Sequence, residues 1–172
     1  MRRVSGRPER SINEERMNYT EPHIPTPEDV IPVMLKLASV KRDELVFDLG
    51  SGDGRIPIAA ARDFHAKAIG VEIRMRLVKE CRIKVKEMGL SDRVKILSQN
   101  FKKVNLRKAD VLALYLSSYT LNILVPKFTR ELRTGTRIVN FDYPILGWNP
   151  TIEVMVVPKG WKKPHPIYLY VT

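Results

Sequence analysis

The most informative stretch of the sequence is Val46-Phe47-Asp48-Leu49-Gly50-Ser51-Gly52-Asp53-Gly54-Arg55. An apolar run from Leu45 to Phe47 predicts a buried strand, which stops at an acidic residue, passes three alternating glycines and enters an alanine-rich helical pattern. Such a turn needs glycine, because a Cβ would block positive φ angles and the approach of a ligand to the backbone. The first N–H groups of the following helix are then free to bind that ligand.

A strand, turn and helix of this kind can bind either a dinucleotide or S-adenosylmethionine, and the spacing of the glycines helps to distinguish the two. A dinucleotide fold requires Gly-x-Gly-x-x-Gly, whereas Gly50, Gly52 and Gly54 form Gly-x-Gly-x-Gly with Asp48 two places ahead. The second spacing resembles motif I of the seven-strand (class I) methyltransferases, which bind S-adenosylmethionine. On this stretch alone, a purely structural turn remains an alternative.

Size and composition narrow the class of protein. A chain of 172 residues with 44% hydrophobic content has room for one domain with a proper core, but not for the second domain of a typical dehydrogenase. No apolar run suits a signal peptide or a membrane span, so we expect a cytoplasmic protein with no membrane partner. Cys81 is the only cysteine and the three histidines lie far apart, so we expect neither a disulfide nor a metal site.

The formal net charge of +11 favours polyanions or acidic protein faces as partners. Association with nucleic acid or nucleoprotein through a basic surface is therefore one interpretation, and simple solvation of helix faces by lysine and arginine is the other. Residues 1–22 mix Arg, Glu, Ser and Pro with few apolar anchors, which predicts a flexible basic N-terminal arm.

The rest of the chain alternates strand and helix patterns and ends in two alternating runs with no helix between them. This order predicts an α/β sandwich that closes with an antiparallel pair. Strands are expected at 45–47, 67–71, 94–97, 110–116, 137–141, 152–157 and 167–171. Helices are expected at 27–39 (with Thr26 as N-cap), directly after the glycine turn, at 74–88 and at 119–132. The inner stripe of the helix at 74–88 comprises Val78, Cys81, Val85 and Met88, which makes Cys81 a packing residue.

Polar and aromatic residues stand where the predicted strands end. Glu72 follows the second strand and is well placed to accept hydrogen bonds from both ribose hydroxyls of a nucleoside; a surface glutamate that opens a helix is the alternative. Asn100 and Phe101 follow the third strand and could meet an adenine edge and ring, although a loop asparagine and a core phenylalanine are nearly as consistent with the local sequence. Tyr115 stands at the end of the fourth strand.

Read together, these residues resemble a class I S-adenosylmethionine-dependent methyltransferase. More narrowly, the chain resembles the small archaeal protein-lysine methyltransferases that lack a SET domain and are related to the nucleosomal-lysine methyltransferase family. The segments that carry the narrower resemblance are Ile24-Pro25-Thr26-Pro27-Glu28, Pro126-Lys127, Glu131-Leu132, Gly135-Thr136-Arg137, Gly147-Trp148-Asn149-Pro150 and Ile167-Tyr168-Leu169-Tyr170-Val171.

The resemblance implies a single methyltransferase domain over residues 23–172. Its fold would be a Rossmann-like seven-stranded sheet with helices on both faces, strand order 3-2-1-4-5-7-6 and the last strand antiparallel. The implied cofactor is S-adenosyl-L-methionine. The implied cofactor-binding residues are Thr26, Asp48, Leu49, Gly50, Ser51, Gly52, Glu72, Ile73, Asn100 and Phe101. Two positions differ from the family pattern, in which an aromatic residue is usual at His23 and an acid at Asn100.

The resemblance also implies the reaction, which is transfer of a methyl group to lysine ε-amino groups of intracellular proteins by in-line displacement. Tyr115 is the candidate catalytic residue, because an apolar, aromatic mouth disfavours the charged form of an amine. The predicted substrate mouth comprises Tyr19, Tyr115, Leu116, Ser117 and Trp148. No dedicated general base is expected, since the chemistry depends mainly on alignment.

Three other functions stay open on the sequence: methylation of RNA at a ribose or ring nitrogen, methylation of a small molecule, and a non-catalytic role in binding the cofactor or nucleic acid. Methylation of the adenine amino group is disfavoured, because no Asn-Pro-Pro-Tyr-like segment follows the fourth strand. Carbon methylation of cytosine is disfavoured because the only cysteine falls on a core stripe.

Overall fold

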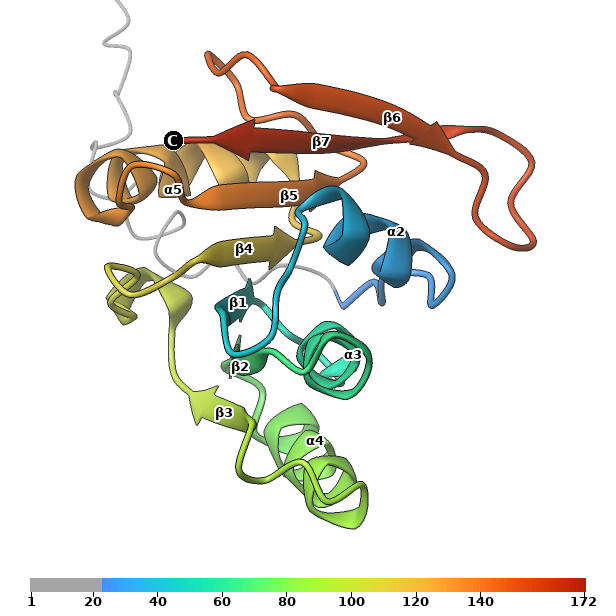
Figure 1. Cartoon of the computed structure of the whole chain (residues 1–172), viewed down its shortest axis with the longest axis vertical. Helices are drawn as coiled ribbons and strands as arrows, with labels where there is room; N and C mark the ends of the chain where they lie inside the picture. Colours follow the sequence, from blue (N-terminus) through green and yellow to red (C-terminus); the bar gives the residue numbers. More distant parts are fainter. Residues whose placement is uncertain (1–22) are drawn as a thin grey trace, which may run out of the picture.

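The glycine turn lies at the carboxyl end of the first strand of a seven-stranded sheet (Figure 1). The computed structural model describes residues 23–172, and the predicted arm over residues 1–22 lies outside them. The strand order is β3-β2-β1-β4-β5-β7-β6, and β7 is antiparallel to both of its neighbours, which confirms the predicted topology. The strands are β1 (Leu45–Leu49), β2 (Lys67–Glu72), β3 (Val94–Ser98), β4 (Val111–Leu114), β5 (Arg137–Phe141), β6 (Ile152–Val156) and β7 (His165–Val171).

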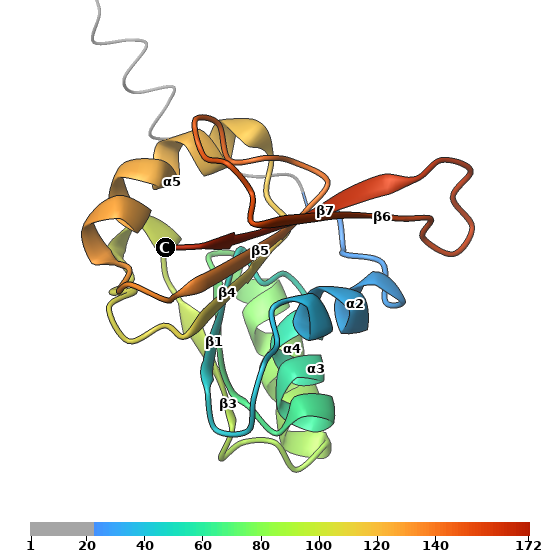
Figure 2. The ribbon, with the colours of Figure 1, turned by 45° about the horizontal axis from the view of Figure 1, so that its top comes forward.

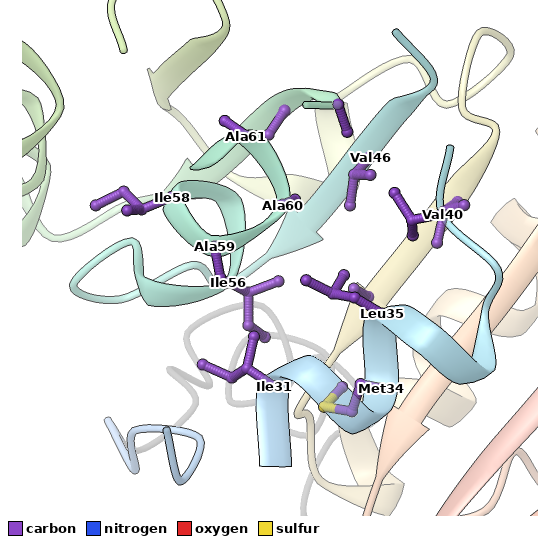
Figure 3. Close-up of a cluster of buried hydrophobic side chains, with 14 of the residues drawn as sticks. Ile31, Met34, Leu35, Val40, Val46, Ile56, Ile58, Ala59, Ala60 and Ala61 are labelled. Carbon is purple, nitrogen blue, oxygen red and sulfur yellow. The ribbon is translucent and has the colours of Figure 1, made fainter. Parts of the chain in front are cut away.

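Helices cover both faces of this sheet and create two cores (Figure 2). The helices α2 (Val30–Leu37), α3 (Arg55–Phe64) and α4 (Met75–Glu87) bury their apolar residues in one cluster, and α5 (Ser118–Glu131) buries its own in the other. Figure 3 shows Leu35 of α2 and Ile56 of α3 in the first cluster, together with Val46 of β1. A short 3-10 helix, η1 (Phe101–Lys103), follows β3. The glycine turn between β1 and α3 is thus anchored by packing on either side.

Several predicted features differ from the structure. The strand β1 does not stop at Asp48 but continues to Leu49. Two differences in the helices have a local cause. The helix α2 begins at Val30 and not at Pro27, because the Pro27 carbonyl accepts the Val30 N–H in a turn that precedes the helix. Thr26 is therefore not the N-cap. Met88 is 44% exposed and not part of the inner stripe, because α4 ends at Glu87 and the helical period no longer applies one residue later. Leu77 occupies the buried stripe instead.

The strand β4 is shorter than predicted and ends at Leu114, so Tyr115 and Leu116 follow the strand instead of forming part of it. The predicted bounds of β5 are confirmed, and those of β2 and β3 differ by one residue each. The parallel register brings the carboxyl ends of β1, β2 and β4 to the same edge of the sheet. This edge is where the candidate site lies.

Glycine at position 54 permits close packing between α3 and α4. Gly54 has a φ of 81° and caps α3, and a Cβ placed on it would overlap the Sγ of Cys81 in α4. Cys81 is fully buried, and burial raises the pKa of its thiol to about 11. The prediction that Cys81 is a packing residue is therefore confirmed, since a protonated, buried thiol is a poor nucleophile.

We predict that Gly54→Ala destabilises the protein more than Gly89→Ala does. Both positions have a positive φ, but a Cβ at Gly89 meets nothing within 4 Å. Both variants place an alanine at a positive φ, so they share that cost in backbone strain. The difference between their free energies of unfolding therefore reports the overlap with Cys81, and we expect this difference to be about 1–3 kcal/mol. Urea unfolding measures both free energies, and equal losses in the two variants would contradict the packing described here.

Candidate cofactor-binding cleft

A cleft opens at the carboxyl end of β1, between the glycine loop and the segment that precedes α2. The residues that line it come from that segment, from β1 and its loop, from the start of α3 and from the end of β4. They are His23, Ile24, Pro25, Thr26, Asp48, Gly50, Ser51, Gly52, Asp53, Arg55, Ile56 and Tyr115. Six of the predicted site residues are thus brought together: Thr26, Asp48, Gly50, Ser51, Gly52 and Tyr115.

Glu72 joins the end of β2 to the glycine loop. Its carboxylate is only 4% exposed and is bound by three backbone N–H groups. Oε2 accepts from Gly52 at 3.0 Å, and Oε1 accepts from Ile73 at 2.9 Å and from Arg74 at 2.8 Å. Hydrogen bonds of backbone donors to an ionised carboxylate are among the stronger ones in proteins. The loop after β1 is therefore fixed relative to β2 by a side chain predicted to contact the cofactor.

Asp48 is a buried carboxylate in an electronegative part of the cleft. Burial raises its pKa well above the usual range, and the negative charges of Glu72 and Asp53 raise it further. Water cannot stabilise the ionised form of a carboxylate that is only 4% exposed. A cationic group in the cleft would offset this penalty. The chemistry of Asp48 is thus suited to a positively charged ligand.

The segment that precedes α2 covers the glycine loop and is held there by Arg55. The Arg55 Nη1 donates to the carbonyl of Thr26 at 2.7 Å, while Nη2 donates to Asp53 at 2.7 Å. Burial acts to raise the pKa of Asp53, but the hydrogen bonds from Arg55 outweigh it and lower that pKa. His23 lies over Gly52, where a Cβ would come within 2.6 Å of the imidazole Cε1. Only glycine at position 52 allows this approach.

Arg55, Asp53 and His23 were not among the predicted site residues. Asp53 and Arg55 stand inside the glycine-rich stretch, so their nearness to the ligand could have been inferred from position alone. The contact of Arg55 with Thr26 spans 29 residues, and no local pattern indicates it.

Tyr115 closes the cleft at the end of β4 and belongs to a group of aromatic rings. Its ring lies 5.0 Å from that of Phe141 and stacks at 6.5 Å on that of Tyr143, measured between centroids. Burial raises the pKa of the Tyr115 phenol to about 12, and the charge of Asp142 acts in the same direction. The phenol is therefore neutral at physiological pH and presents an aromatic wall to the cleft.

The remaining predicted residues in the described part of the chain do not line the cleft. Leu49 and Leu116 are buried in the core beneath α5, and Ile73 is exposed beside Glu72. The Asn100 side chain caps η1 by accepting from the Lys102 N–H at 2.9 Å, and Phe101 packs against the α5 core.

Ser117 is the N-cap of α5, and Trp148 packs edge-on against Tyr170 on the α5 side of the sheet. Tyr19 lies outside the described residues. The roles assigned to all these residues stay predictions.

The structure describes residues 23–172. In this part of the chain, the structure assembles no group of three or more His, Cys, Asp and Glu residues that could hold a metal ion. None of the helices described there has both the length and the apolar character needed to cross a membrane.

Comparison with known proteins is consistent with this geometry. Residues 48–152 match the model of the ANTKMT methyltransferase domain. The chain is 42% identical over 151 residues to a protein-lysine N-methyltransferase of Saccharolobus islandicus (strain REY15A), a match that covers 87% of this chain and 92% of the relative. It is 35% identical to the mouse adenine nucleotide translocase lysine N-methyltransferase, with 66% of this chain and 48% of that protein covered.

A similar solved structure is that of an RNA methyltransferase from Salinibacter ruber in complex with S-adenosyl-L-homocysteine. It superposes with a TM-score of 0.80 at 35% identity, and the match covers 86% of this chain and 93% of that one. The fold and these similarities define an S-adenosylmethionine-dependent methyltransferase. Within that class, the chain belongs to the ANTKMT methyltransferase family.

The residues of the cleft fit S-adenosylmethionine. The buried carboxylate of Asp48 suits a ligand that carries a sulfonium and an ammonium group. Gly52 leaves the backbone accessible where a Cβ would fill the space under His23.

We predict that Asp48→Asn binds S-adenosylmethionine at least about tenfold more weakly, because a charge-assisted hydrogen bond contributes about 1.5–3 kcal/mol. The ligand-free variant should nevertheless be more stable at neutral pH. The pKa of Asp48 is higher in the folded state than in the unfolded state. The ligand-free protein therefore loses stability as the pH rises from the unfolded-state pKa through the folded-state pKa. Asparagine does not ionise and so removes this loss. Calorimetry and thermal unfolding test the two effects, with exposed Asp63→Asn as the control. Unchanged affinity in Asp48→Asn would refute the assignment.

We also predict that Arg55→Ala loosens the segment over the glycine loop. Hydrogen exchange at the amide of the buried Thr26 should accelerate, and affinity for S-adenosylmethionine should fall by about tenfold, because the lost contacts include a charged donor. Arg62→Ala is the matched control, since Arg62 pairs with Asp63 on the same helix at an exposed position. If the two variants have the same amide exchange rates and the same affinity for S-adenosylmethionine, Arg55 does not hold the segment that precedes α2.

Proposed function

We propose that the enzyme transfers methyl groups to lysine ε-amino groups of proteins. The observation that carries this proposal is the 42% identity, over 92% of its length, to a relative named as a protein-lysine N-methyltransferase. The mouse relative, of which the chain spans about half, is also named for lysine methylation of a protein. We further infer that the acceptors are intracellular proteins, that the enzyme acts in the cytoplasm, and that residues 23–172 form a single methyltransferase domain.

In this proposal the predicted residues bind different parts of the cofactor. Asp48 and the loop from Leu49 to Gly52 would hold the amino-acid end, and Glu72 and Ile73 the ribose. Asn100 and Phe101 would bind the adenine, and Thr26 would close the cleft from the N-terminal side. S-adenosylmethionine supplies a methyl group that is already activated on a sulfonium. The protein therefore needs to align the acceptor amine more than to provide acid or base groups.

Tyr115 is the residue we propose to act on the acceptor. A lysine amine has a pKa of about 10.4 in water, so most of it is protonated and unreactive at neutral pH. The ring of Tyr115 is partly buried, stacks on Tyr143 and packs at a tilt against Phe141. Aromatic faces attract an ammonium, and an apolar surrounding favours its neutral form. Leu116, Ser117, Trp148 and Tyr19 remain proposed parts of the mouth.

RNA is a second candidate acceptor, favoured by one specific observation. The Salinibacter ruber structure, which is named as an RNA methyltransferase, is 35% identical and covers most of this chain. The net charge of +11 suits such an acceptor. The outer face of α4 carries exposed cations, and we propose it as the surface for any association with nucleic acid or nucleoprotein; they are Arg76, Lys79, Lys84 and Lys86.

Incubation of the purified enzyme with methyl-labelled S-adenosylmethionine and cell extract tests the choice of acceptor. We expect label in protein, recovered as methyl-lysine after hydrolysis, because of the relatives and the aromatic mouth. The Glu72→Gln variant should transfer at least about tenfold less, since it weakens the bonds to the loop and ribose. Glu80→Gln, on the exposed face of α4, is the control. Label that is removed by RNase and absent from protein would refute lysine methylation.

A further inference from the structure

Asp142, the first residue after β5, adopts a backbone conformation that is unusual for its type. Its φ is 74°, one of four positive values among the non-glycine residues of the described part of the chain. The N–H of Asp142 donates to the Pro166 carbonyl at 2.8 Å, and its Oδ1 lies 2.7 Å from the His165 Nδ1. Residues held in such sparsely populated regions concentrate at functional sites. The strands β5 and β7 thus fix one carboxylate in a defined direction.

This carboxylate lies beside the aromatic wall of the cleft. From Tyr115 the wall continues through Phe141 to Trp161, whose ring is 6.1 Å from that of Phe141, and then to His165, whose ring is 4.4 Å from that of Trp161. Trp161 belongs to the connection between β6 and β7, which projects from the body of the molecule past α2 (Figures 1 and 2). Phe141 is fully buried, so the rings form a packed aromatic group that connects the cleft residue Tyr115 with Trp161 and His165.

The charge of Asp142 acts on Tyr115, the member of this aromatic group that lines the cleft. Its proximity contributes to the raised pKa of Tyr115, after burial. The side chain of Asp142 is 18% exposed, so the carboxylate is only partly screened by water. In a chain of net charge +11, an approaching lysine is repelled by most of the surface. A partly buried carboxylate among aromatic rings is a local exception that attracts an ammonium.

We propose that Asp142, held in place by His165, is the anionic group that attracts the ammonium of the acceptor lysine toward Tyr115, where the apolar surroundings then favour the neutral amine. The inference deepens the proposed function and rests on it. Asp142 acts on binding in this scheme and not on the transfer itself. A carboxylate partner stabilises the charged form of the amine, so its removal weakens acceptor binding without slowing the transfer.

The variant Asp142→Asn separates this role from a structural one. Asparagine tolerates the left-handed conformation as well as aspartate does, and its side-chain oxygen still accepts a hydrogen bond from His165. The substitution thus removes the charge and retains the turn. Asp142→Gly is a second variant that adopts the same φ without strain and removes the carboxylate altogether.

Asp43→Asn is the matched control. Asp43 also has a positive φ, of 64°, and is also ion-paired, with Arg93 at 2.9 Å. It precedes β1, so it lies at the opposite edge of the sheet from the cleft. If removing the charge of any aspartate in the left-handed backbone conformation affected the enzyme, the effect would appear equally in this variant.

The experiment uses a single-lysine peptide from a protein that the wild-type enzyme methylates. For Asp142→Asn and Asp142→Gly we expect KM for the peptide to rise about tenfold, with kcat within about twofold of wild type. Calorimetry should show the same loss in binding of the peptide to the enzyme loaded with S-adenosylhomocysteine, and no loss of affinity for S-adenosylmethionine. Asp43→Asn should match wild type throughout.

Three results overturn the proposal in distinguishable ways. If wild type methylates the peptide but both Asp142 variants retain its KM and peptide affinity, Asp142 does not position the acceptor and the proposed function stands. If wild type methylates RNA and no protein, lysine methylation and the role of Asp142 fail together. A loss of kcat in the Asp142 variants that parallels a lower melting temperature indicates a structural role and also overturns the proposal.

Discussion

The cleft depends on the attachment of the glycine loop to the Glu72 carboxylate. The loop contains three glycines in succession at alternate positions, so its backbone has more freedom than almost any other part of the chain. The hydrogen bond from the Gly52 N–H to Glu72 and those from Gly50 and Ser51 to the Val71 carbonyl remove that freedom. The position of Asp48, the approach of His23 and the start of α3 all follow from where this loop is held.

The attachment of the glycine loop to Glu72 also brings several carboxylates together at the cleft of an otherwise basic protein. Glu72 and Asp53 lie close enough to Asp48 for their negative charges to raise its pKa. Asp53 is neutralised by Arg55, whereas Asp48 is buried with a raised pKa. The ligand-free cleft is thus electrostatically unfavourable, and a cationic ligand relieves the penalty. Binding energy of this kind selects for a sulfonium or ammonium compound by charge as well as by shape.

Local patterns in the sequence were enough to predict most of the fold. The strand β5 was predicted residue by residue, and the alternating runs at the end of the chain indicated the β6–β7 pair. The strand order came from resemblance to a family. The start of α2 and the exposure of Met88 were missed, because a turn at Pro27 and the end of α4 depend on contacts that periodicity does not report.

The roles of the candidate site residues stay predictions, and the contacts that the sequence did not indicate join residues far apart in the chain. Asp48 and Gly52 were proposed from the glycine spacing and the family resemblance, and Glu72 from its place at the end of the second strand; the parallel register brings the ends of these strands to one edge of the sheet. The contact of Arg55 with Thr26 and that of Asp142 with His165 span 29 and 23 residues and join segments with no shared pattern.

The most direct measurement of the central claim is a crystal structure of the enzyme with S-adenosylhomocysteine. The account predicts the ligand in this cleft, with its amino group at Asp48 and its ribose at Glu72; a ligand bound elsewhere, or one that leaves Asp48 and Glu72 without contact, would contradict it.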